Sequence, residues 1–343
     1  MSSTGKRSSL FPCGSGGEAA RMTTDTPAYR LTERADLLGY APYLLGFHPA
    51  DSVVVMGLRG DRIVVAARAD VAGPRTETVR RFAQVLRAAG RGRDAVGSVV
   101  LLGYGPGAGA ADATRHAADA LDARGYHVRE VLLQDGDRYH CLQCDRCTPA
   151  EGARFDPSAT AAAAMATYEG LVALPDRDAV ERQVEPVGGL AAAAMTQAVD
   201  RAEERLAALL ADGGDAALVT AGEAAVEAAL DVAGTGGRLD DDAAAWLIVL
   251  LHDLRCRDHA WQRTDAAAWQ HELWLDLTRR AEPALAAPPA ALLAWSAWRA
   301  GNGVLARAAL DRALHADPAY SLAHLLTDAL DRAVPPHSIH PWP

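Results

Sequence analysis

Residues 52–69 read SVVVMGLRGDRIVVAARA, two runs rich in β-branched residues on either side of Arg59-Gly60-Asp61. Such runs favour extended backbone, and a glycine between them favours a tight turn. The segment therefore predicts a β-hairpin with strands at 52–57 and 62–69.

Strand and helix patterns alternate around this hairpin from residue 22 to residue 150. A helix is expected before it, from a cap at Thr32 to Leu38, followed by a turn at 40–43. After the hairpin we expect a helix at 76–89, a strand at 98–104, a helix at 110–124 and strands at 127–133 and 138–142. The order β-β-α-β-α-β-β is typical of an α/β layer domain with a partly parallel sheet.

Residues 151–334 show no convincing strand pattern and predict an all-α helical domain, followed by a tail at 335–343. Much of the chain's excess of alanine, 74 residues in total, lies here and indicates closely packed helices. Asp240 suits a helix N-cap, for example. The expected helices lie near 158–173, 176–185, 189–211, 215–233, 240–260, 265–281, 288–300, 304–316 and 319–333.

One helix pair, at 288–318, has the spacing of a tetratricopeptide-like hairpin. Small residues stand where the two helices would cross, Gly301-Asn302 falls at the turn and Pro318 follows the second helix. Only one copy is evident, and such repeats need about three units to be stable alone. We therefore expect the pair to pack on the other helices as structure; a peptide-binding groove is the alternative.

Composition excludes several classes of function. Lys6 is the only lysine beside 33 arginines, so the chain has no phosphate-loop nucleotide site and no lysine for pyridoxal phosphate or for kinase chemistry. A net charge of −10 argues against general nucleic-acid binding, which needs clustered cations. No apolar run approaches the roughly 18–20 residues that a membrane span needs.

The first 21 residues are rich in serine and glycine and have no signal-peptide core. We interpret residues 1–21 as a disordered leader that is not necessarily translated, with Met22 as an alternative start to Met1. The five cysteines are odd in number and unevenly spaced, unlike a secreted disulfide framework. A cytoplasmic location is therefore expected.

Three thiols lie within seven residues at Cys141, Cys144 and Cys147, next to His140. Two overlapping C-x-x-C steps have the spacing of a zinc knuckle, and His140 offers a fourth ligand. The other interpretations are reduced thiols at a strand end, which we favour, and redox chemistry. Metal analysis of untagged protein distinguishes zinc from the other two.

Four polar residues flank the predicted hairpin: His48, Asp51, Arg68 and Asp70. They are candidates for a ligand-binding site at one edge of the sheet. Arg68 and Asp70 have period-two spacing and so share one face of a strand, where they can also simply pair with each other.

The chain resembles the domain-of-unknown-function family 4192 (DUF4192) of high-GC Gram-positive bacteria. The resemblance rests on PYLLGFHPADSVVVMGLRG at 42–60, Arg68-x-Asp70, DGDRYHCLQCDRCTPAEG at 135–152, LRCRDHA at 254–260 and the segment 288–326. It spans residues 32–336 in order. It implies Met22 as the natural start, and it implies no activity or catalytic residue.

Two functions follow as hypotheses. The first is a non-enzymatic interaction or regulatory module that binds a protein partner through the helical domain, since no catalytic constellation stands out. The alternative is a small-ligand-binding protein or metal-dependent enzyme that uses the sheet edge and the Cys141–Cys147 cluster.

Overall fold

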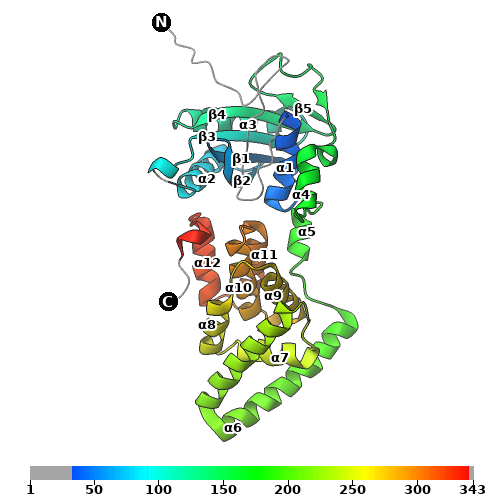
Figure 1. Ribbon diagram of the computed structural model, residues 1–343, viewed down its shortest axis with the longest axis vertical. Helices are drawn as coiled ribbons and strands as arrows, with labels where there is room; N and C mark the ends of the chain where they lie inside the picture. Colours follow the sequence, from blue (N-terminus) through cyan, green and yellow to red (C-terminus); the bar gives the residue numbers. More distant parts are fainter. Residues whose placement is uncertain (1–32, 91, 340–343) are drawn as a thin grey trace. The chain divides into compact units, whose positions relative to one another are not determined.

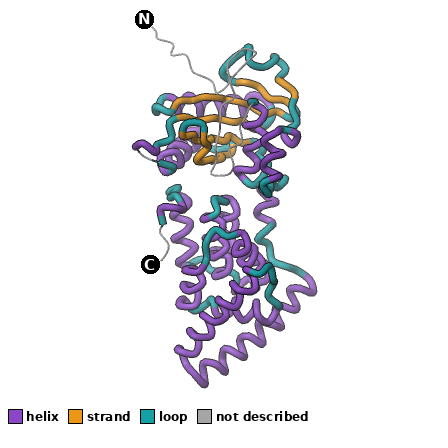
Figure 2. The backbone as a smooth tube through the Cα atoms, viewed as in Figure 1, coloured by secondary structure: helices purple, strands orange, loops and turns teal. Residues whose placement is uncertain are grey.

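The computed structural model describes residues 33–90 and 92–339. The chain forms two compact units, one up to Arg177 and one from Asp178 (Figure 1). Among the described residues, strands occur in the first unit, whereas the second contains helices and loops (Figure 2). The predicted class, an α/β domain followed by a helical region, is confirmed. The leader at 1–21 and Met22 lie outside the described residues.

The first unit contains a six-stranded mixed sheet with the order β2-β1-β3-β4-β5-β6. Its strands are β1 (Ser52–Arg59), β2 (Arg62–Asp70), β3 (Ser98–Tyr104), β4 (His127–Asp135), β5 (Arg138–Cys141) and β6 (Ala153–Arg154). The predicted hairpin is confirmed, with Ser52 opposite Asp70 and Arg59 opposite Arg62. Strands β3 and β4 are parallel and every other pair is antiparallel, so the expectation of a partly parallel sheet holds.

Helices cover both faces of this sheet (Figure 1). They are α1 (Arg34–Leu45), α2 (Arg75–Ala88), α3 (Gly107–Asp122) and α4 (Ala161–Tyr168). Successive side chains of a strand point to opposite faces. Val53 and Val55 of β1 therefore join the core beneath α2 and α3, while Val54 and Met56 join the core beneath α1 and α4.

Helix α1 is longer than predicted, because it continues through Pro42 instead of ending at Leu38. Proline has no N–H, so within a helix it leaves the carbonyl four residues earlier without its usual donor. Here that carbonyl belongs to Leu38, and the buried Tyr104 hydroxyl donates to it at 3.2 Å. Burial raises the pKa of Tyr104 above its ordinary value. A side chain from β3 thus replaces the missing backbone bond.

The first unit extends beyond the boundary expected at residue 150. Ala153–Arg154 form a short strand that pairs with β5, where no strand was predicted. Helix α4 then packs against α1, and Ala162 and Ala166 belong to the same core as Leu37 and Ala41 of that helix. A strand of two residues is too short to give a sequence pattern. Its pairing with β5 and the core contacts of α4 therefore determine the structure of this region.

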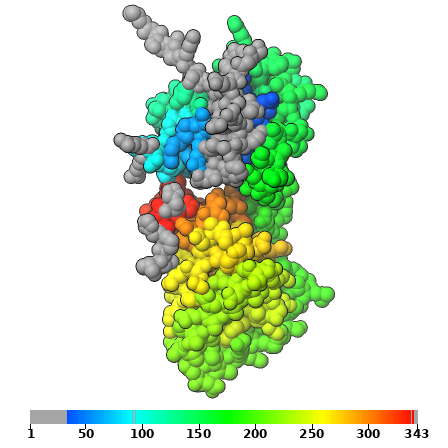
Figure 3. Space-filling view, in the orientation of Figure 1, coloured from blue at the N-terminus to red at the C-terminus, as the bar shows by residue number. Residues whose placement is uncertain are grey.

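The second unit begins within α5 (Arg177–Arg182). Its other helices are α6 (Gly189–Gly234), α7 (Asp241–Leu250), α8 (Leu254–Arg263), α9 (Ala268–Arg280), α10 (Ala287–Arg299), α11 (Gly303–Ala316) and α12 (Ser321–Asp331). The chain also has 3₁₀ turns at Gly92–Asp94, Pro157–Ala159, Pro283–Leu285 and Pro336–Ser338. Helix α6 has a break at Gly214, which corresponds to the two helices predicted at 189–211 and 215–233. Figure 3 shows α6, in yellow-green, over much of the visible face of this unit.

The single helix predicted at 240–260 is wrong, because the structure divides it into α7 and α8. The Asp253 carboxylate accepts a hydrogen bond from the Arg255 backbone N–H at 2.9 Å and so starts a new helix. Asp240 caps α7 in the same way, as predicted, by accepting from the Ala243 N–H at 2.8 Å.

Helix α10 is the centre of the second unit. Its residues 287–298 are all buried, and it contacts α8, α9, α11 and α12. The predicted turn to α11 is present, with Gly301 at φ 83° and the Asn302 side chain accepting from the Leu305 N–H at 3.1 Å. The burial of α10 favours the structural interpretation of this pair over a peptide groove on α10.

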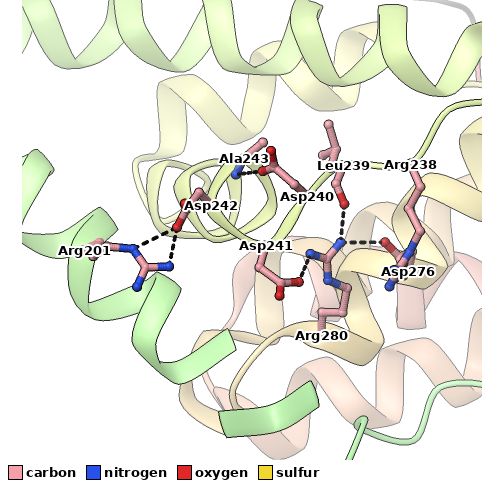
Figure 4. A network of polar contacts seen from close by, with 9 residues as sticks. All are labelled: Arg201, Arg238, Leu239, Asp240, Asp241, Asp242, Ala243, Asp276 and Arg280. Carbon is pink, nitrogen blue, oxygen red and sulfur yellow. Dashed lines mark hydrogen bonds and ion pairs between the residues drawn. The ribbon is translucent and has the colours of Figure 1, made fainter. Parts of the chain in front are cut away.

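A polar network joins α6, α7 and α9 (Figure 4). The buried guanidinium of Arg280 donates to Asp241 at 2.5 Å and to Asp276 at 3.0 Å. Arg201 on α6 donates to Asp242 at 2.9 Å. The acidic run at the start of α7 therefore positions helices of the second unit.

Candidate functional site

His48 and Asp51, just before β1, and Arg68 and Asp70, at the end of β2, lie at one edge of the sheet. Their role in ligand binding stays a prediction. Ser52 starts β1 opposite both Asp70, which ends β2, and Tyr104, which ends β3. Tyr104 in turn pairs with Gln134 near the end of β4. This edge therefore carries the carboxyl ends of the parallel pair, where open α/β sheets usually bind ligands.

Arg68 contacts its neighbours closely at this edge. Its Nε donates to the Ser52 hydroxyl at 2.7 Å, and an Nη donates to Asp70 at 2.5 Å and to the Ala50 carbonyl at 3.4 Å. Its guanidinium also lies over the Phe47 ring, 5.7 Å from the centroid. With 15% of its side chain exposed, Arg68 acts as a structural cation, and the predicted pairing with Asp70 is confirmed.

Asp51 and His48 are exposed at the same edge. Asp51 has a φ of 42°, which only a small fraction of non-glycine residues adopt. Gly105 lies against it: a Cβ there would stand 2.7 Å from an Asp51 carboxylate oxygen. The Gly107 amide, the first of α3, donates to Asp135 at 3.3 Å. The Asp135 carboxylate thus accepts from the first amide at the N-terminus of α3.

An exposed apolar segment, Tyr168–Val172, begins at the last residue of α4. Tyr168 is 88% exposed, Val172 is 68% exposed and Leu171 is also exposed. The helix ends in a Schellman motif: the Gly170 N–H donates to the Thr167 carbonyl at 3.0 Å and the Leu171 N–H to Ala166 at 2.9 Å. The backbone of the segment is therefore fixed although its side chains reach solvent.

Leu174, two residues beyond this segment, is bonded to the loop after α1. The Leu174 N–H donates to the Gly46 carbonyl at 2.9 Å, and the His48 N–H donates to the Leu174 carbonyl at 2.9 Å. The chain just after the exposed segment therefore pairs with the loop that contains His48. Sequence reasoning did not identify the exposed segment, although a glycine just after an alanine-rich helix is a signal for this type of helix end.

Cys141 is the last residue of β5, and Cys144 and Cys147 lie in the loop that follows. Cys141, Cys144 and Cys147 are half-buried. The Cys141 N–H donates to the Thr148 hydroxyl at 3.2 Å. Within the described chain, no three histidine, cysteine, aspartate or glutamate side chains converge to hold a metal ion. The predicted zinc site of Cys141, Cys144, Cys147 and His140 is not assembled here, and zinc binding stays a prediction.

A buried ion pair lies close to this loop. Glu130 of β4 is fully buried, and Arg34 of α1 donates to its carboxylate at 3.1 Å with 12% of the arginine side chain exposed. Burial lowers the pKa of Arg34, but the hydrogen bond to Glu130 and the electrostatic attraction of Glu130 and the nearby cysteines together outweigh that effect, and the pKa is raised. Sequence reasoning also missed this pair, because Glu130 follows Arg129 in a strand with polar residues at both ends and so does not stand out as a buried charge.

The chain belongs to the family described as Domain of unknown function (DUF4192), whose family model matches residues 35–337. The resemblance seen in the sequence is thereby confirmed. No curated protein and no solved structure matches the chain. Within the described residues, no helix combines the length and the apolarity that crossing a membrane requires.

Proposed function

We propose that this DUF4192 protein is a non-enzymatic module that binds a protein partner through the exposed apolar segment Tyr168–Val172. Three apolar side chains within five residues are exposed there on a fixed backbone. Covering apolar surface is the main favourable contribution to protein association, and clustered exposure of this kind marks interaction sites. The segment belongs to the first unit, so this proposal places partner binding there and not in the helical domain, where the sequence predicted it.

The contacts of the sheet edge also support a non-catalytic role. Arg68 is engaged by Ser52, Ala50 and Asp70, and Asp135 is engaged by the Gly107 amide. Through these bonds the Arg68 and Asp135 side chains contact other residues of the protein. We further propose a cytoplasmic location, on the spacing of the cysteines.

Co-isolation from cells of the native host tests this proposal. The double variant Tyr168→Ser, Val172→Ser should keep the fold, because both side chains are mostly exposed. It should lose at least one protein that the wild type retains after washing. Leu190→Ser is the matched control, since Leu190 is 91% exposed and lies on α6, far along the chain. Recovery of the same proteins by all three forms would contradict the proposal.

A second candidate is small-ligand binding at the sheet edge. The observation that favours it is the φ of 42° at Asp51, because strained backbone occurs preferentially at functional sites. A thermal-shift screen with nucleotides and divalent metals tests it. A rise of several degrees that Asp51→Gly abolishes would support ligand binding, and an unchanged midpoint with every compound would count against it.

A further inference from the structure

Cys144 and Cys147 stand at the two ends of a turn, which the proposed function does not use. Asp145 and Arg146 form the centre of a turn, and the Cys147 N–H donates to the Cys144 carbonyl at 3.5 Å. The first and fourth Cα atoms of such a turn lie within about 7 Å. Disulfides join residues whose Cα atoms are about 4.4–6.8 Å apart. The turn therefore holds Cys144 and Cys147 at a separation that a disulfide can span.

The surroundings of this turn favour thiol chemistry. Both cysteines are half-buried, so solvent reaches the loop. Arg146 lies within the turn, and the Arg34 guanidinium is near enough to interact electrostatically with Cys147. Positive charges stabilise a thiolate, which is the reactive form of cysteine. The buried Cys256 differs, because burial raises the pKa of its thiol to about 11.

We propose that Cys144 and Cys147 are a dithiol that forms a reversible disulfide by exchange with a low-molecular-weight disulfide such as oxidised glutathione. Cys147 loses its proton to solvent and attacks one sulfur of the oxidant, which releases one thiolate. Cys144 then loses its proton and attacks the Cys147 sulfur, which releases the second thiolate. The protein loses two electrons and two protons, and the oxidant gains them as two thiols.

Trypsin offers a direct test, because cleavage after Arg138, Arg146 and Arg154 separates the two cysteines. Full-length protein is equilibrated in glutathione buffers from reducing to oxidising, blocked with N-ethylmaleimide, digested and analysed by mass spectrometry. We expect peptides 139–146 and 147–154 to become disulfide-linked as the buffer becomes more oxidising, and to separate again in reduced glutathione. The wild type alone gives this result, so it does not depend on a variant that folds.

Single variants identify the bond. The linked peptides should persist in Cys141→Ser and disappear in both Cys144→Ser and Cys147→Ser. Loss in Cys141→Ser with persistence in Cys144→Ser would overturn the proposal in favour of a Cys141–Cys147 bond. Absence of linked peptides at every ratio would also overturn it. So would linkage that appears only after a chelator is added, because the resting cluster would then be a metal site.

Discussion

At the scale of single residues, the buried ion pair of Arg34 and Glu130 joins the first turn of α1 to β4. Glu130 is a charged residue of β4, and it is fully buried. A buried charge is costly unless a partner compensates it. Arg34 supplies that partner from the first turn of α1, so this pair specifies where the helix begins against the sheet.

Arg34→Met should therefore lower the free energy of unfolding of the first unit by about 3–5 kcal/mol. The cause is the loss of the Arg34 charge beside the buried Glu130 carboxylate rather than lost packing. Hydrogen exchange of β3 and β4 amides as a function of urea measures it. The double variant Arg34→Met, Glu130→Met should recover most of the loss, and a double variant as unstable as the single one would contradict this explanation.

His271 carries a pH prediction for the second unit. Burial lowers its pKa below the value of about 6.5 that an unfolded histidine has. Its Nδ1 is buried without a hydrogen-bond partner in the described structure. As the pH falls below about 6.5, His271 takes up a proton in the unfolded chain but not yet in the folded protein. The folded protein therefore loses stability as the pH falls from about 6.5 to the lowered pKa of His271.

The free energy of unfolding should accordingly fall between pH 7.5 and pH 5.5, and less steeply in His271→Gln. Urea titrations followed by tryptophan fluorescence measure it, because every tryptophan of the chain lies at or after Trp246. An equal or steeper fall in His271→Gln would show that this histidine does not contribute.

At the scale of elements, periodicity predicted the strands of the hairpin and most helices, whereas contacts between elements decided their ends. Helix α1 passes Pro42 because Tyr104 supplies a donor. The break before α8 depends on one carboxylate at Asp253. The shared position of Asp51, Arg68 and Asp70 was predictable, because the hairpin pairs the start of β1 with the end of β2. The exposure of Tyr168–Val172 was not predictable, because it depends on how α4 packs in the core.

The packing of α6 on α8 depends on Gly222. A Cβ at this position would collide with the Cys256 sulfur and lie 2.9 Å from the Cys256 Cβ. Gly222→Ala should therefore destabilise the second unit by about 1–3 kcal/mol, despite the better helix propensity of alanine. Tryptophan fluorescence in urea measures the change. Gly234→Ala, where the added methyl meets nothing within 4 Å, is the control and should cost nothing.

At the scale of the whole molecule, the boundary after Arg177 makes a prediction about fragments. A chain of residues 22–177 retains α4 against α1 and should fold, with circular dichroism of a mixed sheet and helix protein. A chain of residues 22–150 lacks α4 and leaves the apolar face of α1 uncovered, so it should aggregate or remain unfolded. Equal folding of both fragments would contradict the role of α4.

The proposed function requires that Tyr168–Val172 be a protein-binding surface. Replacement of Tyr168 by photoreactive p-benzoylphenylalanine, followed by irradiation of living cells of the native host, tests this most directly. We predict a discrete covalent adduct with another protein at position 168 and none when the same residue replaces Leu190. No adduct at position 168, or equal adducts at both positions, would contradict the proposed function.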